Sequence, residues 1–381
     1  MMKRTERRQF LQGLAAIGAW SLLGSARAAP THDAATTRIA AAWRGPRPDD
    51  PYFAGVFEAD WSQKKLRIQQ AIPLPTRPHG LLPEVGGSVL VCGVRPGRWL
   101  LRMAADGRIE RQINLDDEPG HCRLNGHAIA SLYSDVLYTT ETDQKSGAGR
   151  IGVRDRSSLK KLDEWPSHGR EPHQLLIDTD GRVLVANGGI PRTVSDKKYD
   201  LHRMNSSLVR LDGQNGALQQ QWTVDDQRLS LRHLAWSAAP AGGRLLGVAL
   251  QAEHETAAER GTAPILAVLA GDVLHIPTRV ADGAGYAGDI CPALNGGFAL
   301  SNNQLGVAQL WHPARPEALT PIVELPETYA LSDWDGPTAG GGVLVSTGLG
   351  LVRWHPQTKP LFLPWPQAMA VDNHWRVLNE T

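Results

Sequence analysis

A unit of four strand signals recurs six times along the chain, and this repeat restricts the possible folds more than any other feature. Short β-branched or apolar runs are separated by turn residues, chiefly Gly, Pro, Asp and Asn. In the clearest unit, a strand that begins near His79 is followed by strands at 87–93, 99–103 and 109–113. Asp106-Gly107 supplies a hairpin turn between the last two. The six units together extend from about residue 76 to about residue 365.

The strands left over at the two ends of the chain predict how the repeat closes. Three strand signals precede the first unit, at 37–43, 51–57 and 65–70, and one follows the last, at 373–378. Together they make a seventh unit, so we expect an all-β, seven-bladed β-propeller whose last blade pairs N- and C-terminal strands. Six or eight blades are the alternatives. The expected domain covers residues 29–381, with almost no helix.

A histidine or an aspartate stands near the start of the innermost strand of every predicted blade. The intervals between successive members are 48, 46, 60, 56, 44 and 41 residues. The seven members are His79, His127, His173, His233, Asp289, Asp333 and His374. Because innermost strands line the central channel of a propeller, these side chains are predicted to form a ring around one axis.

Polar residues also recur at the ends of the predicted second strands, which should reach the same mouth of the channel. The four candidates are Glu141, Asn187, Gln251 and Asn302. We expect them, with Asp289 and Asp333, to bind a ligand or to hold the metal ligands in place. Two long insertions, 190–206 and 253–263, join second to third strands and should cover this mouth.

The residue types in the ring point to a transition metal. Imidazole binds Zn, Cu, Fe and Ni, and added carboxylate favours Zn or non-haem Fe. We therefore predict His79, His127, His173, His233 and His374 as metal ligands, with Fe or Zn as the cofactor. A small anionic ligand is the alternative guest. A purely structural role is also open, because other propeller repeats place a Gly-His pair, like Gly126-His127, before the first strand.

The N-terminus has the pattern of an export signal. Arg7-Arg8 precede Phe10 and Leu11, an apolar run extends from Leu14 to Leu23, and Ala26-Arg27-Ala28 resembles a cleavage site. About ten apolar residues are too few to span a bilayer. We expect a twin-arginine signal peptide at residues 1–28, no membrane span and a periplasmic location.

Composition excludes some function classes. The full chain has a formal net charge of +1. Removal of residues 1–28, which hold five basic residues and one acidic residue, would change this charge to −3. Nucleic acid is therefore not an expected partner. Three cysteines are too few for a disulfide framework. Ser-His-Asp, phosphate-loop and dinucleotide motifs are absent.

The chain resembles the uncharacterised twin-arginine-exported propeller proteins of Gram-negative bacteria. The resemblance rests on the export signal and on four short segments: 77–80 (Arg-Pro-His-Gly), 126–128 (Gly-His-Ala), 171–174 (Glu-Pro-His-Gln) and 186–189 (Ala-Asn-Gly-Gly). These proteins are often encoded beside imelysin-like iron-regulated proteins. The resemblance implies a periplasmic setting, an iron-uptake context and a neighbouring exported iron-uptake protein as partner, but no reaction.

Three functions are consistent with these observations. The first is a periplasmic binding or accessory protein in iron or metal handling, with a metal or small ligand at the ring. The second is a protein-interaction scaffold without a bound cofactor. The third is a metal-dependent oxidoreductase or a lactonase-like hydrolase.

Overall fold

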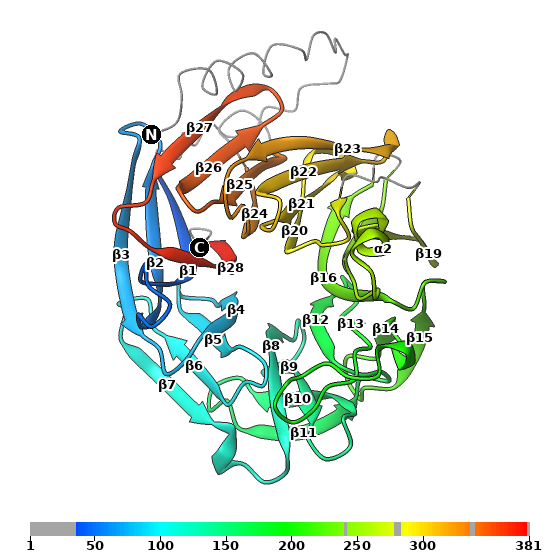
Figure 1. Ribbon diagram of the computed structural model, residues 1–381. Coiled ribbons are helices and arrows are strands. Elements are labelled where there is room, and N and C mark those ends of the chain that lie inside the picture. The colour runs from blue at the N-terminus through cyan, green and yellow to red at the C-terminus, as the bar shows by residue number, and fades with distance from the viewer. Residues whose placement is uncertain (1–35, 240–241, 278–282, 336–339, 379–381) are drawn as a thin grey trace. The chain divides into compact units, whose positions relative to one another are not determined.

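Seven antiparallel four-stranded sheets surround one axis in the computed structural model (Figure 1). The structure describes residues 36–239, 242–277, 283–335 and 340–378. In each sheet the strands follow one another from the axis outward in chain order, with one exception. The predicted seven-bladed β-propeller is therefore confirmed. The predicted signal peptide at residues 1–28 lies outside the described residues.

The exception is the sheet that closes the propeller. Its order is β28-β1-β2-β3, with β28 (Ala370–Leu378) innermost, followed by β1 (Thr36–Arg44), β2 (Tyr52–Asp60) and β3 (Lys65–Pro73). The C-terminal strand β28 pairs antiparallel with β1 from Arg38↔Leu378 to Arg44↔Ala370. The two ends of the described chain thus complete one blade, as the leftover strands predicted.

The other six blades follow in sequence, and we number them 1 to 6, with the closing blade as blade 7. Blade 1 is β4 (Pro78–Pro83), β5 (Val89–Gly93), β6 (Trp99–Met103) and β7 (Ile109–Asn114). Blade 2 is β8 (Cys122–Ala130), β9 (Val136–Asp143), β10 (Gly149–Asp155) and β11 (Lys161–Pro166). Blade 3 is β12 (Pro172–Ile177), β13 (Val183–Asn187), β14 (Ser207–Leu211) and β15 (Leu218–Trp222).

The second half of the propeller has the same organisation. Blade 4 is β16 (Leu229–Ala238), β17 (Arg244–Ala252), β18 (Leu266–Ala270) and β19 (Val273–His275). Blade 5 is β20 (Asp289–Pro292), β21 (Phe298–Asn302), β22 (Val307–His312) and β23 (Arg315–Glu324). Blade 6 is β24 (Leu331–Trp334), β25 (Gly342–Ser346), β26 (Gly350–His355) and β27 (Thr358–Pro364).

Helix is confined to short segments of the described chain. The one described α-helix, α2 (Ala257–Thr262), lies in the second predicted insertion and begins with a capping box of Thr256 and Glu259. The 3-10 turns are η2 (Leu115–Asp117), η3 (Leu201–Arg203) and η5 (Leu294–Gly296). No helix among the described residues is long and apolar enough to cross a membrane.

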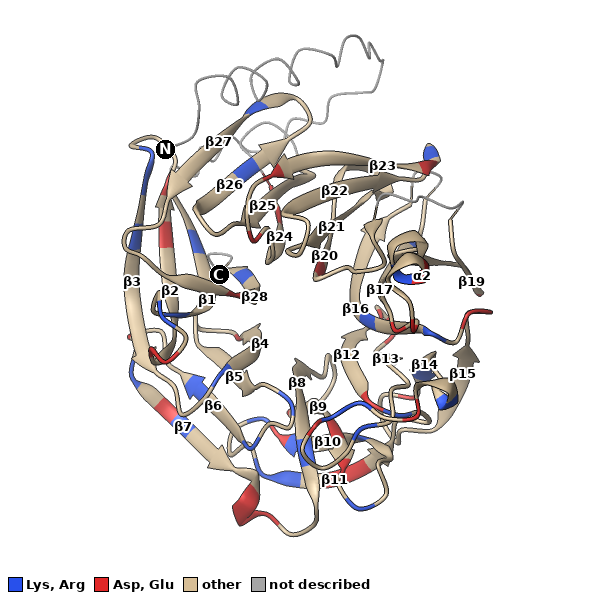
Figure 2. Ribbon diagram, viewed as in Figure 1, with Lys and Arg blue, Asp and Glu red and all other residues tan. Residues whose placement is uncertain are grey.

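The hydrophobic core lies between the blades. Seven clusters of buried residues each join two adjacent blades, so that together they fill every blade interface. Strand β1 shows the cause. Its side chains alternate, with Ile39, Ala41 and Trp43 packing toward blade 6 and Ala40 and Ala42 toward blade 1. Most charged residues lie on outer strands and loops (Figure 2).

Candidate functional site

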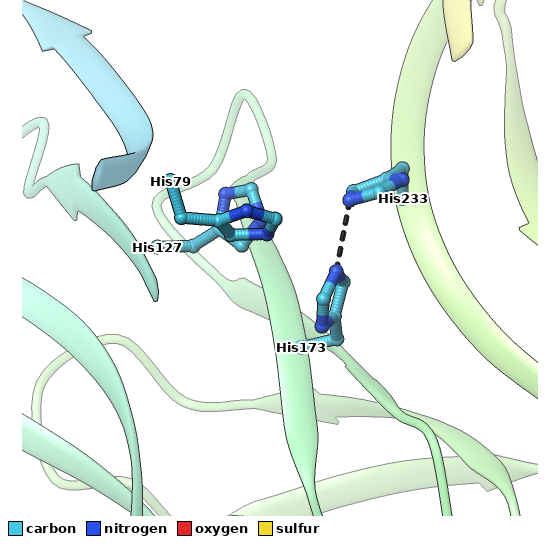
Figure 3. A group of neighbouring side chains, drawn as sticks. All are labelled: His79, His127, His173 and His233. Carbon is cyan, nitrogen blue, oxygen red and sulfur yellow. Dashed lines mark hydrogen bonds between the residues drawn. The ribbon is translucent and has the colours of Figure 1, made fainter. Parts of the chain in front are cut away.

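Five of the predicted ring residues come together on the axis, and we call them the histidine cluster: His79, His127, His173, His233 and His374. All five side chains are buried. The centres of adjacent imidazoles are as close as 4.4 Å for His233 and His374 and 4.6 Å for His173 and His233. Figure 3 shows four of them pointing inward from different blades. The prediction that these histidines converge is confirmed.

A β-bulge places each of these histidines. In β12, Pro172 pairs with Asn187 and Leu175 with Val185, so that two residues, His173 and Gln174, oppose one. Similar register shifts occur around the histidines of β4, β8, β16 and β28. The innermost strands of blades 5 and 6 pair without a shift. An extra residue bends the strand and turns a side chain out of the regular alternation, which here directs each imidazole to the axis.

Gly126 is required for the packing of two cluster members. Its φ is +106°, a conformation that favours glycine. A Cβ atom at this position would lie 2.5 Å from Cδ2 of His79. The Gly-His pair of blade 2 therefore lets the backbone approach the neighbouring imidazole, in addition to placing His127.

Burial favours the neutral form of four imidazoles in the cluster. It lowers the pKa of His79, His127, His173 and His233 well below the ordinary value of 6.5, and nearby imidazoles and guanidinium groups lower it further. Several nitrogens have no hydrogen-bond partner among the described residues: both of His79, Nε2 of His127 and Nδ1 of His233. Neutral imidazoles with free lone pairs are the form that binds metal ions.

Nε2 of His233 lies between two other Nε2 atoms. Nε2 of His233 lies 2.8 Å from Nε2 of His173 and 3.0 Å from Nε2 of His374. The Asn373 amide nitrogen, 3.0 Å from Nε2 of His374, can only donate, so this Nε2 carries a lone pair. A neutral imidazole nitrogen has one hydrogen or one lone pair. Nε2 of His233 therefore cannot complete a good hydrogen bond with both neighbours.

Asp289 stands behind His374. Its Oδ1 lies 3.3 Å from Nδ1 of His374, within ion-pair range but not in hydrogen-bond geometry. Backbone N–H groups of Ile290 and Leu331 donate to the two carboxylate oxygens and hold them in place. Since Nε2 of His374 carries the lone pair, Nδ1 carries the hydrogen and faces this carboxylate. A carboxylate behind a histidine is a common arrangement at metal sites.

The geometry fits a transition metal ion. One ligand atom from each of His79, His127, His173 and His233 lies within 4.8 Å of the others, and His233, Asp289 and His374 form a second such group. Tetrahedral nitrogens about 2.0–2.1 Å from zinc are roughly 3.4 Å apart. Small side-chain shifts would therefore bring three or four of these nitrogens onto one ion.

Asp333 does not join the cluster, so its predicted place in the ring was wrong. In blade 5 Asp289 pairs with Ser301, the fourth residue of β21, and in blade 6 Leu331 pairs with Val345, the fourth residue of β25. Leu331 therefore occupies the position of Asp289. Asp333 lies two residues farther along β24, with an exposed side chain. Its predicted role in ligand binding is not tested by these contacts.

Glu141 and Asn187 form hydrogen bonds inside their own blades or with adjoining loops. Glu141 is fully buried and pairs with Nη2 of Arg154 at 2.8 Å and Nζ of Lys161 at 2.5 Å. Nδ2 of Asn187 donates to the backbone oxygen of Ser167 at 2.9 Å. No hydrogen bond between described residues links either side chain to the histidine cluster. A role for them in ligand binding stays a prediction that these contacts do not favour.

Gln251 and Asn302 have similar structural contacts. Nε2 of Gln251 donates to the backbone oxygen of Ala287 at 3.0 Å, which ties blade 4 to the segment before β20. Asn302 donates to Gly283 and accepts from the N–H groups of Gln304 and Leu305, so that it closes the turn after β21. Their proposed ligand contacts also stay predictions.

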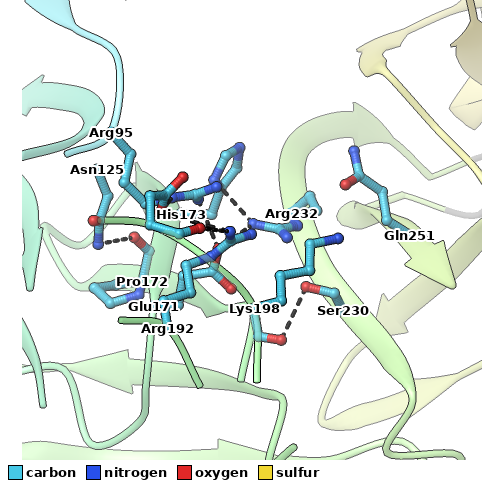
Figure 4. A network of polar contacts seen from close by, with 12 residues as sticks. Arg95, Asn125, Glu171, Pro172, His173, Arg192, Lys198, Ser230, Arg232 and Gln251 are labelled. Carbon is cyan, nitrogen blue, oxygen red and sulfur yellow. Dashed lines mark hydrogen bonds and ion pairs between the residues drawn. The ribbon is translucent and has the colours of Figure 1, made fainter. Parts of the chain in front are cut away.

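The sequence analysis missed an ionic network beside the cluster. Oε1 of Glu171 accepts from Nη1 of Arg95 at 2.6 Å, Nε of Arg192 at 2.7 Å and Nη1 of Arg232 at 2.9 Å (Figure 4). Nη1 of Arg232 also lies 3.5 Å from Nδ1 of His173. Glu171 and Arg232 come close to His173 and His233 in the sequence, and this proximity was the available signal.

The network joins the predicted insertions to the cluster. Burial alone would raise the pKa of Glu171, but the guanidinium groups of Arg232, Arg95 and Arg192 lower it to about 2. From the first insertion, Lys198 pairs with Glu253, the first residue of the second, at 2.6 Å. Nε2 of His254, in the second insertion, lies 2.9 Å from Oδ2 of Asp226. The predicted position of the insertions above the ring agrees with these contacts.

A third group of potential metal ligands, Cys122, Glu141 and Glu164, has a different explanation. Nζ of Lys161 lies 2.5 Å from Glu141 and 3.0 Å from Glu164, so a resident cation already balances the two carboxylates. Burial raises the pKa of the Cys122 thiol to about 12, which disfavours the thiolate that a metal needs. All three cysteines are free thiols.

Comparison with known families gives one match. A family model described as "Protein of unknown function (DUF1513)" matches residues 72–378. No curated protein matches the chain.

Several solved propellers are similar in structure. A putative 6-phosphogluconolactonase from Bacteroides fragilis has a TM-score of 0.56 at 13% identity, covering 92% of this chain and 100% of that one. Hydrazine synthase from Kuenenia stuttgartiensis has a TM-score of 0.55 at 13% identity, covering 80% and 91%. Virginiamycin B lyase from Staphylococcus aureus has a TM-score of 0.52 at 8% identity, covering 82% and 95%. At such low identity these similarities show the fold alone.

Proposed function

We propose that this chain, which belongs to the DUF1513 family of proteins of unknown function, binds a transition metal ion at its histidine cluster. The supporting observation is the buried group of His79, His127, His173 and His233, in which one ligand atom from each residue lies within 4.8 Å of the others. A cation among these four imidazoles would accept their free lone pairs. The preferred ions are Fe and Zn, because the donors are imidazoles with a carboxylate nearby.

Three features of the protein would contribute to metal binding. The imidazoles of the histidine cluster would supply the nitrogens, and four of them are kept neutral by burial. Asp289 would orient His374 and partly balance the charge of the ion. The bulges would hold the donors close together before the ion binds, which reduces the entropy lost on binding.

Titration with Zn²⁺ and, without oxygen, with Fe²⁺ tests this proposal. The purified mature protein should bind a stoichiometric ion in competition with a chromogenic chelator. His233→Ala should weaken binding by at least about tenfold, because His233 belongs to both ligand groups. His275→Ala, an exposed histidine at the outer edge of blade 4, is the matched control and should bind normally. Equal affinity in His233→Ala and the control would contradict the proposal.

We further propose that the protein acts in the periplasm, after export by the twin-arginine route, as a binding or accessory protein in iron handling. Support comes from Arg7-Arg8, the apolar run after them and the cleavage pattern. Replacing both arginines by lysine should leave the full-length precursor in the cytoplasm. Immunoblots of cell fractions would show this, and an unchanged periplasmic mature band would contradict it.

Within this proposal, a neighbouring exported iron-uptake protein is the expected partner. Deletion of the gene should impair growth in iron-limited medium, and a His173→Ala, His233→Ala double variant should fail to restore it. Full restoration by this variant would favour the interaction-scaffold alternative, in which the propeller needs no bound ion.

A further inference from the structure

A pocket of about 360 Å³ adjoins the ionic network beside the histidine cluster. Arg95, Glu171 and Arg192 of the network line it, together with Lys145 and Tyr199. Polar contacts lead from Arg95 and Glu171 in the pocket lining through Arg232 to His173 of the cluster, and neither Arg232 nor His173 lines the pocket. A ligand in this pocket would therefore lie close to the cluster without contacting an ion held there.

Two guanidinium groups present free edges in this region. Arg95 uses Nε on Asp196 and Nη1 on Glu171, and Arg192 uses Nε on Glu171 and Nη1 on the backbone oxygen of Asp196. The Nη2 atom of each has no hydrogen bond to the described residues and is not a buried unpaired atom. Both Nη2 atoms are therefore available to donate.

The charges around Glu171 also favour an additional anion. Four cations, those of Arg95, Arg192, Arg232 and Lys198, share three carboxylates, those of Glu171, Asp196 and Glu253. Burial lowers the pKa of Arg192. The carboxylates of Glu171 and Asp196 raise it, but the positive charges of Arg95 and Arg232 offset part of that effect. The other acidic residue of the pocket, Asp143, accepts from two backbone N–H groups of its own turn.

We infer that this pocket binds a small organic molecule with two or more carboxylates. Guanidinium edges match carboxylate groups in geometry as well as in charge. The volume is about ten times the share of one water molecule, roughly 30 Å³, so one inorganic ion would fill only part of it. Lys145 and Tyr199, which have no hydrogen bond to the described residues through their side-chain heads, add a cation and a hydroxyl. This inference does not depend on the proposed metal.

Calorimetric titration with tricarballylate tests the inference. This tricarboxylate lacks the hydroxyl group of stronger chelators, so it should not remove a bound metal. The mature protein should bind it saturably, one molecule per chain, and at least about tenfold more tightly than acetate or inorganic phosphate. Absent binding at millimolar concentration, or equal affinity for acetate or phosphate, would overturn the inference.

Variants of the first insertion locate the site. Arg192→Gln should weaken tricarballylate binding by at least about tenfold. Arg192→Lys keeps the positive charge but loses the paired N–H donors of the guanidinium group, so it should also weaken binding. It is the milder of the two changes for folding. Arg203→Gln changes an exposed arginine of the same insertion and should bind normally. Normal binding by both Arg192 variants would overturn the assignment.

A cluster variant separates this inference from the proposed metal site. Folded His79→Ala protein should lose metal affinity but keep tricarballylate affinity, because His79 does not line the pocket. Loss of tricarballylate binding together with the metal would overturn the inference, since it would mean that the metal itself had held the carboxylate.

Discussion

Nε2 of His173 lies 2.8 Å from Nε2 of His233, although 60 residues separate them in the chain. The two belong to adjacent blades, and a β-bulge in each innermost strand turns them toward the same point. The innermost strands of blades 5 and 6 pair without a shift, and blade 5 contributes a carboxylate, Asp289, behind His374. The bulges, more than the repeat itself, therefore convert a recurring residue type into a candidate site.

The carboxylate behind His374 should strengthen metal binding. Asp289→Asn removes its charge, and we expect affinity for Zn²⁺ to fall by about 10- to 100-fold. Asp333→Asn is the matched change in the next blade, where the carboxylate is exposed and outside the cluster, and should have little effect. Chelator competition measures both. Equal losses would show that Asp333 belongs to the site after all.

Gly126 should be needed for stability and for the cluster. Gly126→Ala introduces a Cβ atom that meets the His79 imidazole, at a φ of +106°. Gly120 has a φ of +104° with open space around it, so Gly120→Ala carries the backbone strain alone. We expect the strain to cost about 1–2 kcal/mol of unfolding free energy and the contact to add about 1–3 kcal/mol.

Urea unfolding of the two glycine variants measures this difference, and metal titration provides a second readout. Gly126→Ala should also bind metal more weakly, because His79 must move. If the two variants were equally stable and bound metal equally well, the close packing of Gly126 on His79 would be of no consequence.

Glu141 should stabilise the fold in a pH-dependent way. Burial would raise its pKa, but Arg154 and Lys161 lower it below 4.5. A carboxylate with a lowered folded-state pKa contributes its full stability above pH 4.5 and loses it as the pH falls through the folded-state value. Glu141→Gln should therefore destabilise the protein by about 3–5 kcal/mol at neutral pH, since it leaves Arg154 buried without this partner.

Denaturant unfolding from pH 7 to pH 3 checks the sign. The difference between the parent protein and Glu141→Gln should be constant above pH 5 and should shrink below pH 4.5. A difference that grew toward low pH would contradict this account of Glu141.

The architecture could be predicted from the sequence because its strand signals are local and periodic. The same holds for the closing blade, which the three strands before the first unit and the one strand after the last unit indicated. The sequence also identified the five histidines, since one residue type recurred once per blade. The position of Asp333 could not be read correctly, because a shift of two residues along β24 leaves the strand pattern unchanged while Leu331 takes the axial position. Glu171 and Arg232 were missed because their contacts cross blade boundaries and carry no sequence period.

The metal content of the native protein tests the central claim most directly. Mature protein purified without chelators from the periplasm should carry about one Fe or Zn per chain by mass spectrometric elemental analysis, and the His173→Ala, His233→Ala double variant should carry almost none. A folded parent protein that is free of transition metal, and that takes up neither Fe²⁺ nor Zn²⁺ when they are added, would contradict the proposal.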